Sequence, residues 1–549
     1  MTCDVLVAGG GVAGLMAAIA AADSGANVIV AEKANSKRSG SGAMGNDHFL
    51  CYIPSVHGTN PAEWIREMNE SQVGGNNDMD MVRRYLKECF DRVKDWDSWG
   101  VGMREHGDWE FNGHAKPGHM RIWLKYAGRD QKRIFTREAE KRGVIILNHH
   151  PFTDIITDDT GAVAGAVCVD LTGETPRMQV IRTRSVILTT GGITRMFCSN
   201  TSGNIFNYSS CPANVCAGRA AAYRAGARLI NLDTTGTGGG CKYLNRGGKA
   251  TWIGVYSDIE GKPLGPFVTK PEKEYGDLTG DVWPGMFSLK RAQGEPVFMN
   301  CSKASDEDID YMLWGLSNEG NMATLDALKE EGFDFRRHMV EFDGKGQTIR
   351  GGVDVDVSGA STVRGLYAAG DEMGNFRADM GGAATYGHIA GESAAAYSRG
   401  LKNIEAEKLP ATDKIRQRYS EILNRPADTS TPDWREINLA VMQVMTDYCG
   451  IDVRSERFMQ VGLSHLKRIR EKAETAHCAD GHEFMRCLEA EDLALMAELA
   501  IRSARERKET RGKHNRVDYP YTNSLLNDKF VVVSNVCGTP VTGWRDKRK

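Results

Sequence analysis

Residues 5–33, VLVAGGGVAGLMAAIAAADSGANVIVAEK, combine two short apolar runs with three spaced glycines and one helix-like stretch. Val5 to Ala8 is typical of a buried parallel strand, and Gly9, Gly11 and Gly14 follow it at G-x-G-x-x-G spacing. We expect Gly9 to allow a tight turn, Gly11 to let a pyrophosphate approach the backbone, and Gly14 to let the next helix pack closely against the sheet. The pattern therefore predicts a βαβ unit that binds an adenine dinucleotide.

The helix of this unit is expected from Val12 to about Asp23, and its first turn contains Val12 and Ala13. Free N–H groups and the helix dipole favour the dinucleotide phosphates at this end. The second apolar run, Asn27 to Ala31, ends at Glu32. A carboxylate at this strand end can accept hydrogen bonds from ribose hydroxyls, and it disfavours a 2′-phosphate. These features are compatible with either NAD or FAD.

Length and composition bound the other possibilities. The chain has 549 residues, too many for one compact core, so two or three domains are expected. Its 41% hydrophobic and 26% charged residues are typical of a globular protein. A net charge of −3 provides no excess of positive charge that would bind nucleic acid. The first strand begins within four residues of Met1, so no targeting peptide is expected, and the alanine-rich run at 13–22 is too short to span a bilayer. We therefore expect a cytoplasmic protein without a membrane span.

The thirteen cysteines are scattered, and none forms a C-x-x-C pair. The chain therefore has the pattern of neither a zinc ribbon nor a cysteine-ligated iron–sulfur run. His149 and His150 are adjacent on a predicted strand edge and would point to opposite faces. From these patterns we expect no metal site in this chain.

The order of strand and helix signals predicts several domains. Residues 61–102 follow a helical pattern, and strand-like runs return at 144–147, 162–169 and 185–189. From Thr234 to about Gly344 the chain is rich in Gly, Trp, Lys and Asp, which indicates an inserted domain. The expected division is a nucleotide-binding domain at 1–233 and 345–400, an inserted domain at 234–344, and a helical, charged C-terminal domain at 401–549.

The segment GLYAAGD at 365–371 distinguishes FAD from NAD. It has the pattern of a strand that ends in small residues and an acid, far downstream of the glycine motif. A nicotinamide dehydrogenase does not need such a strand to return to the nucleotide, whereas a flavoprotein must also bind the ribitol and the isoalloxazine. The sequence therefore favours FAD.

Four segments together resemble the flavoprotein subunit of the fumarate reductase and succinate dehydrogenase superfamily: EKANSKRSG at 32–40, TTGG at 189–192, GLYAAGD at 365–371 and RERKETRGKHNRVDYP at 505–520. The resemblance extends over essentially the whole chain. It implies an α/β fold in which a Rossmann-like FAD-binding domain carries an inserted α+β capping domain and a C-terminal helical domain. KRSG at 37–40, Gly370-Asp371 and MGGAATYGHIAG at 380–391 are also similar to the adenylylsulfate reductase α subunit.

The resemblance implies a set of FAD-binding residues. Those expected at the ADP half are Gly9, Gly11, Val12, Ala13, Gly14, Glu32 and Lys33. Those expected from the phosphates outward to the flavin are Ser39, Gly40, Gly45, Gly191, Asp371, and the run of Ala383, Ala384 and Thr385 beneath the isoalloxazine.

Three positions depart from the family pattern. In membrane succinate dehydrogenases a histidine after an Arg-Ser pair carries FAD covalently, but here Gly40 follows Arg38-Ser39, so we expect non-covalent FAD. Gln347 stands where the dicarboxylate enzymes have a histidine, and Lys242 stands where they have the segment with the proton-shuttling arginine. The last two differences count against succinate or fumarate as the substrate.

A two-electron reaction of an anionic substrate needs a cation to hold the anion and a group to move a proton. The candidates are Lys242 and Arg246 in the inserted domain, and Arg377 and His388 in the returning flavin segment. Arg377 is preferred, because it precedes Gly381-Gly382 in the region where the family keeps a substrate-binding arginine.

The function that these features predict is an FAD-dependent oxidoreductase subunit. It would transfer two electrons between the flavin and a small anionic substrate and exchange electrons through an iron–sulfur partner. Two alternatives stay open: an adenylylsulfate reductase-like α subunit, and an electron-transfer flavoprotein subunit whose substrate site has decayed.

Overall fold

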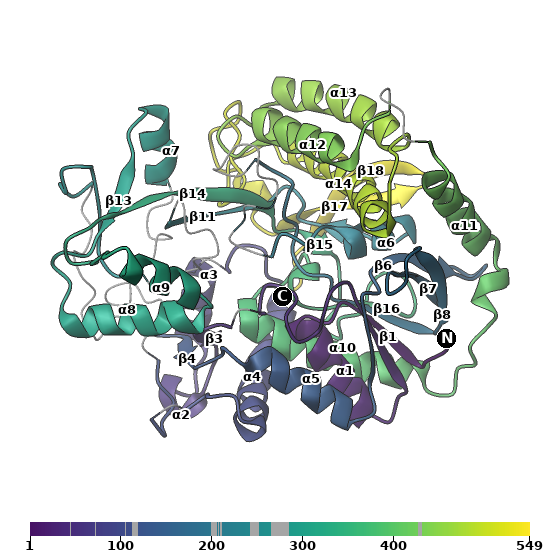
Figure 1. Cartoon of the computed structure of the whole chain (residues 1–549), viewed down its shortest axis with the longest axis horizontal. Coiled ribbons are helices and arrows are strands. Elements are labelled where there is room, and N and C mark those ends of the chain that lie inside the picture. Colours follow the sequence, from purple (N-terminus) through teal and green to yellow (C-terminus); the bar gives the residue numbers. More distant parts are fainter. Residues whose placement is uncertain are drawn as a thin grey trace.

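A five-stranded parallel sheet forms the centre of the protein, as a computed structural model shows (Figure 1). In spatial order its strands are β16 (Leu366–Ala368), β9 (Ser185–Leu188), β1 (Val5–Ala8), β2 (Val28–Glu32) and β5 (Ile145–Asn148). All four residues of β1 are buried, as in a parallel strand that is covered on both faces. The sheet confirms the predicted α/β class, and it brings GLYAAGD beside the nucleotide-binding strands.

The structure describes residues 1–43, 45–71, 73–104, 106–111, 119–198, 206, 208, 211–241, 252–264, 285–426 and 431–549. Within these ranges, none of the helices has both the length and the apolar character needed to cross a membrane.

Two helices cover the sheet beside the glycine motif. Helix α1 (Val12–Asp23) packs against α10 (Asp379–Ser398). Their backbones approach closely, since a Cβ on Gly387 would lie 2.4 Å from the carbonyl oxygen of Ala13, and one on Gly391 would lie 2.3 Å from that of Ala17. Helix α10 is therefore held against the nucleotide-binding helix along much of its length.

Further elements complete this domain. An antiparallel sheet contains β6 (Phe152–Thr157), β7 (Val163–Asp170) and β8 (Arg177–Arg182), and β3 (His48–Leu50) pairs with β4 (Trp123–Lys125). The helices of this part are α2 (Pro54–His57), α3 (Ala62–Glu70), α4 (Met79–Trp99), α5 (Gln131–Lys141) and α6 (Ala217–Arg224). Within residues 61–102, predicted as helical, the structure has the two helices α3 and α4.

The inserted part has its own sheet and core, to the left of the parallel sheet in Figure 1. Its antiparallel strands lie in the order β11 (Thr235–Cys241), β14 (Val340–Ile349), β13 (Val297–Asn300) and β12 (Val255–Ser257). Helices α7 (Gly285–Ala292), α8 (Asp306–Asn318) and α9 (Met322–Glu330) accompany them. Trp252, Met312 and Phe342 belong to the buried cluster that joins these elements.

The C-terminal part contains α11 (Pro410–Leu423), α12 (Trp434–Cys449), α13 (Glu456–Ala473) and α14 (Gly481–Glu506). It ends in a β-hairpin, β17 (Lys529–Val536) and β18 (Thr539–Asp546), which the helical pattern did not predict. Strand β17 pairs with β10 (Leu229–Ile230), which also pairs with β15 (Gly352–Val353). The chain terminus therefore completes a sheet with strands of the nucleotide-binding domain.

Residues 507–514 connect this C-terminal part to the turn at Asp233, between β10 and β11. Arg507 pairs with Asp233 at 2.7 Å and with Glu509 at 2.9 Å. The buried ring of His514 accepts a hydrogen bond from Arg454 at Nδ1, at 2.9 Å, and donates one from Nε2 to the carbonyl oxygen of Arg507, at 3.0 Å. These two bonds require the neutral imidazole.

We expect His514 to make the fold sensitive to acid. Burial and the charge of Arg454 lower the pKa of His514 to about 4, below the ordinary value of about 6.5. The unfolded chain then binds more protons between these values, so the stability contributed by the neutral ring is complete above pH ~6.5 and is lost as pH falls towards 4. Between pH 7 and pH 4.5, the free energy of unfolding measured with urea should fall by about 2 kcal/mol more in wild type than in His514→Gln. Equal losses would contradict this assignment.

Candidate functional site

The glycine motif forms a tight turn at the carboxyl end of β1. Gly9 has φ of +108°, and a Cβ on it would lie 2.6 Å from the carbonyl oxygen of Thr189. A Cβ on Gly14 would lie only 1.9 Å from the carbonyl oxygen of Gly9. On Gly11, in contrast, the nearest atom to a Cβ would be 4.0 Å away, so this glycine faces open space. The three glycines thus occupy the positions that the predicted pyrophosphate loop requires.

Glu32 is buried at the end of β2, where both of its carboxylate oxygens accept backbone hydrogen bonds. Oε2 accepts from the N–H of Gly10 at 2.7 Å, and Oε1 accepts from that of Ala34 at 2.8 Å. Each carboxylate oxygen has a second lone pair, which is available to a ribose hydroxyl. The acid therefore both shapes the loop and faces the place expected for the ribose.

Lys132, from α5, also supports this loop, and no sequence motif marked it. Its Nζ donates a hydrogen bond to the carbonyl oxygen of Gly10, and its side chain is buried. Burial lowers the pKa of Lys132 to about 8, while the charge of Glu32 acts in the opposite direction. A helix pattern alone does not show that a lysine points inward at a glycine loop.

A cavity runs from this loop across the carboxyl ends of β1, β2, β9 and β16. Such a position is the usual ligand site of an open parallel sheet. The predicted residues that line it are Gly9, Gly11, Val12, Ala13, Glu32, Lys33, Ser39, Gly40, Gly191, Asp371 and Ala383. Lining residues that the prediction missed include Arg38, Ser41, Thr190, Asn214, Asp379 and Met380.

The cavity walls fit the phosphates and sugars of FAD. The hydroxyl of Ser39 is buried and has no hydrogen-bond partner within the described part of the chain. It lies in the same cavity as Gly11 and the N-terminal turn of α1, where free backbone N–H groups favour anions. An unsatisfied buried hydroxyl is costly, and a bound phosphate or ribitol oxygen would satisfy it.

Four predicted FAD-binding residues do not line this cavity. Gly14 acts through packing, as described above, and Ala384 and Thr385 are fully buried within α10. Gly45 has φ of +102°, and a Cβ there would lie 2.1 Å from the carbonyl oxygen of Asn318, in α8. The loop at Gly45 thus contacts the inserted part of the chain.

Arg377 lies in the cavity wall between two acids. Its Nε donates to Oδ1 of Asp379 at 2.8 Å, and Nη1 lies 3.7 Å from Oδ1 of Asp371. All three residues line the cavity, and the Arg377 side chain is 28% exposed. Asp379, the first residue of α10, has φ of +41°, an uncommon conformation for a residue with a side chain. In this conformation the carboxylate of Asp379 lies beside the guanidinium of Arg377.

Arg219 fixes the loops around Asp371 and was not predicted. It is fully buried and donates to the carbonyl oxygens of Gly191 at 2.7 Å, Gly351 at 2.9 Å and Asp371. Its ion-pair partner is Glu372, 3.7 Å away. Burial raises the pKa of Glu372 above its ordinary value, although the charge of Arg219 acts in the opposite direction. Since its partners are backbone carbonyls from three distant loops, no local sequence pattern marks this residue.

Of the other catalytic candidates, His388 alone belongs to the described residues. His388 does not line the cavity, and its Nε2 lies 3.3 Å from Oε1 of Glu392, one turn further along α10. Burial and the charge of Arg92 lower the pKa of His388 to about 4. Lys242 and Arg246 lie outside the described residues, and the side chain of Gln347 is not described either.

Comparisons with known proteins identify two parts of the chain. Residues 4–237 match the family described as FAD binding domain, and residues 438–539 match the family described as fumarate reductase flavoprotein C-term. These two matches together cover more than half of the chain. The match to the first family shows that FAD is the cofactor of this chain.

Relatives and solved structures extend over nearly all of the chain. A fumarate reductase (CoM/CoB) subunit of Methanothermobacter marburgensis is 25% identical, over 96% of this chain and 97% of that protein. L-aspartate oxidase of Streptomyces coelicolor is 24% identical, over 97% of this chain and 91% of that protein.

Among solved structures, adenylylsulfate reductase from Archaeoglobus fulgidus has a TM-score of 0.84 at 19% identity, covering 100% of this chain and 96% of that one. A quinol fumarate reductase chain from E. coli has a TM-score of 0.81 at 19% identity, covering 100% and 97%. The two structures share this fold from end to end. With the matches to the FAD binding domain family and to the fumarate reductase flavoprotein C-terminal family, the chain is identified as an FAD-dependent oxidoreductase that is similar to the fumarate reductase flavoproteins.

Proposed function

We propose that this chain is the flavoprotein subunit of an oxidoreductase that acts on a small anionic substrate held by Arg377, with electrons exchanged through an iron–sulfur partner subunit. The observation that carries the proposal is the position of Arg377, whose guanidinium faces the same cavity as the glycine loop and Asp371. Relatives that are similar over nearly their whole length are named fumarate reductase subunits, which supports a subunit role.

FAD supplies a two-electron carrier to such a site. Gly9, Gly11 and the first turn of α1 would hold its phosphates, and Glu32 would hold its ribose. Arg377 would bind and orient the substrate anion through charge-assisted hydrogen bonds. Asp371 and Asp379 limit the movement of the guanidinium, because they contact it from two sides. An oriented cation of this kind would favour one substrate geometry over others.

We expect the flavin to be bound without a covalent link. Gly40, at the position of the covalent histidine, has φ of +80°, and a Cβ on it would face the Cα of Gly11 at 3.6 Å. It offers no nucleophile to the cavity. Acid precipitation of the yellow protein should therefore release intact FAD into the supernatant. Yellow colour that stays in the washed pellet would contradict this expectation.

The proposal is tested by anaerobic reoxidation of the reduced protein. Unsaturated acids, enoyl thioesters and adenylylsulfate are added one at a time, and the return of flavin absorbance is followed. We expect one anionic compound to reoxidise the flavin rapidly without any partner protein. Reoxidation by adenylylsulfate alone would favour the adenylylsulfate reductase-like alternative. If no compound acts while an artificial oxidant does, the chain is an electron-transfer subunit without its own substrate.

A further inference from the structure

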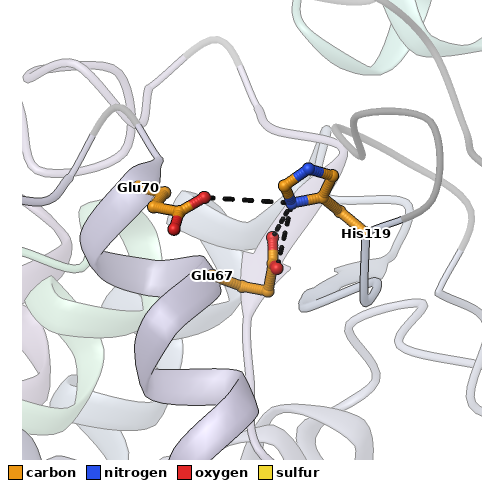
Figure 2. A group of neighbouring side chains, drawn as sticks. All are labelled: Glu67, Glu70 and His119. Atoms are coloured by element: carbon orange, nitrogen blue, oxygen red, sulfur yellow. Dashed lines mark hydrogen bonds and ion pairs between the residues drawn. The ribbon is translucent and has the colours of Figure 1, made fainter.

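Two glutamates and one histidine meet at a place separate from the flavin cavity (Figure 2). Glu67 and Glu70 lie on one face of α3, three residues apart, and His119 comes from the segment that precedes β4. The Nδ1 atom of His119 lies 3.0 and 2.9 Å from the two carboxylate oxygens of Glu67, and 4.0 Å from Oε2 of Glu70. One ligand atom from each residue lies within 4.8 Å of the others.

The charges of this cluster are unbalanced. The Glu67 side chain is only 9% exposed, and both carboxylates stand in the last turn of α3, where the helix dipole disfavours negative charge and favours cations. Across the described ranges, His119 is the only basic side chain that contacts either carboxylate. One imidazole carries at most a single positive charge and so cannot balance two carboxylates, one of which is buried, whereas a divalent cation would.

The geometry also fits a metal ion. Ligand atoms that each lie about 2.1 Å from one ion are roughly 3 to 4 Å from one another. The distances from His119 Nδ1 to the two glutamates fall in this range, and Glu70, which is about half exposed, has room to adjust. Carboxylate and imidazole together are ligands of first-row divalent transition metals.

We propose that Glu67, Glu70 and His119 bind a divalent transition-metal ion of the Mn²⁺, Fe²⁺ and Zn²⁺ class, with water completing its coordination. The ion would join α3 to the segment that enters β4, and β4 pairs with β3. The site is thus a structural link within the first domain. The patterns of cysteines and histidines along the sequence did not predict this site, because His119 lies 49 residues beyond Glu70 in the chain.

The experiment measures Mn²⁺ binding to the FAD-loaded, chelator-treated full chain. Mn²⁺ is the first probe because it prefers oxygen and imidazole ligands and is not drawn to the exposed thiols of Cys198 and Cys537. The electron paramagnetic resonance signal of free Mn²⁺ should fall until about one ion per chain is bound, and added Zn²⁺ should displace it. Glu70→Gln and His119→Gln should each weaken binding by roughly tenfold or more, as removal of a ligand requires.

Glu63→Gln provides the matched control, because Glu63 lies on the same helix but is exposed and pairs with Arg66. It should bind Mn²⁺ like wild type. Flavin absorbance shows that each variant is folded, and Glu70 and His119 are partly exposed, so their replacement does not open the core. Absence of binding in wild type would overturn the proposal. Unchanged binding in both ligand variants, or an equal loss in Glu63→Gln, would overturn it as well. None of these results depends on the substrate of the flavin.

Discussion

Replacing Glu489 with alanine should destabilise the protein by about 3 to 5 kcal/mol, the usual cost of removing one partner from a buried ion pair. Glu489 lies on α14 with a side chain only 5% exposed, and it contacts Lys33 and Arg486 at 2.7 Å each, as well as Arg195. Burial by itself raises the pKa of Glu489, but these three cations hold it well below its usual range. Without the carboxylate, the buried guanidinium of Arg195 loses the counter-charge that Glu489 provides.

The loss should extend to the cofactor. Lys33 also donates to the carbonyl oxygen of Ala213 at 2.7 Å, and both of these residues line the FAD cavity. We therefore expect Glu489→Ala to unfold at lower urea concentration and to contain less FAD. The control is Glu471→Ala, at an exposed position on α13, which should change stability by no more than about 0.5 kcal/mol. Wild-type stability in Glu489→Ala would show that the network does not hold the C-terminal helices to the FAD-binding domain.

Replacing Arg377 with alanine should lower kcat/KM by roughly tenfold to a few hundredfold. Hydrogen bonds from a guanidinium to a carboxylate contribute on the order of 1.5 to 3 kcal/mol, and each ~1.4 kcal/mol corresponds to a factor of ten. Arg377→Lys should restore only part of the activity, because an ammonium group does not reproduce the planar fork. The rates are measured with whichever compound reoxidises the reduced wild-type protein.

FAD content separates the possible roles of Arg377. We expect it to stay near normal in Arg377→Ala, since the phosphates are expected at the glycine loop and not at this residue. Arg399→Ala is the control, because Arg399 is exposed at the other end of α10 and donates to the carbonyl oxygen of Ser24, at 3.3 Å. Loss of FAD from Arg377→Ala would assign the residue to the cofactor. Full activity with normal FAD would show that Arg377 does not hold the substrate.

The C-terminal segment shows where prediction from one sequence reaches its limit. RERKETRGKHNRVDYP resembles a family signature, yet its physical role depends on Asp233, which Arg507 of this segment binds from more than 270 residues away. The hairpin that follows turns at Cys537 and Gly538, which both have positive φ. Its pairing with β10 depends on a strand of two residues in another domain, which no local pattern identifies.

The sequence by itself determined the nucleotide-binding unit, because its determinants are local. The strand, the three glycines, the helix and the acid stand within residues 5–32. Gly9 and Gly14 meet steric limits set by near neighbours or by one adjacent strand, whereas Gly11 faces open space. Tertiary structure decided which polar side chains surround that unit. Lys132 contacts Gly10 and Glu489 contacts Lys33, each from a distant helix, and Arg219 holds the neighbouring loops at Gly191 and Asp371. Helical periodicity shows that such residues belong to helices, but their burial and their partners depend on how the helices pack together.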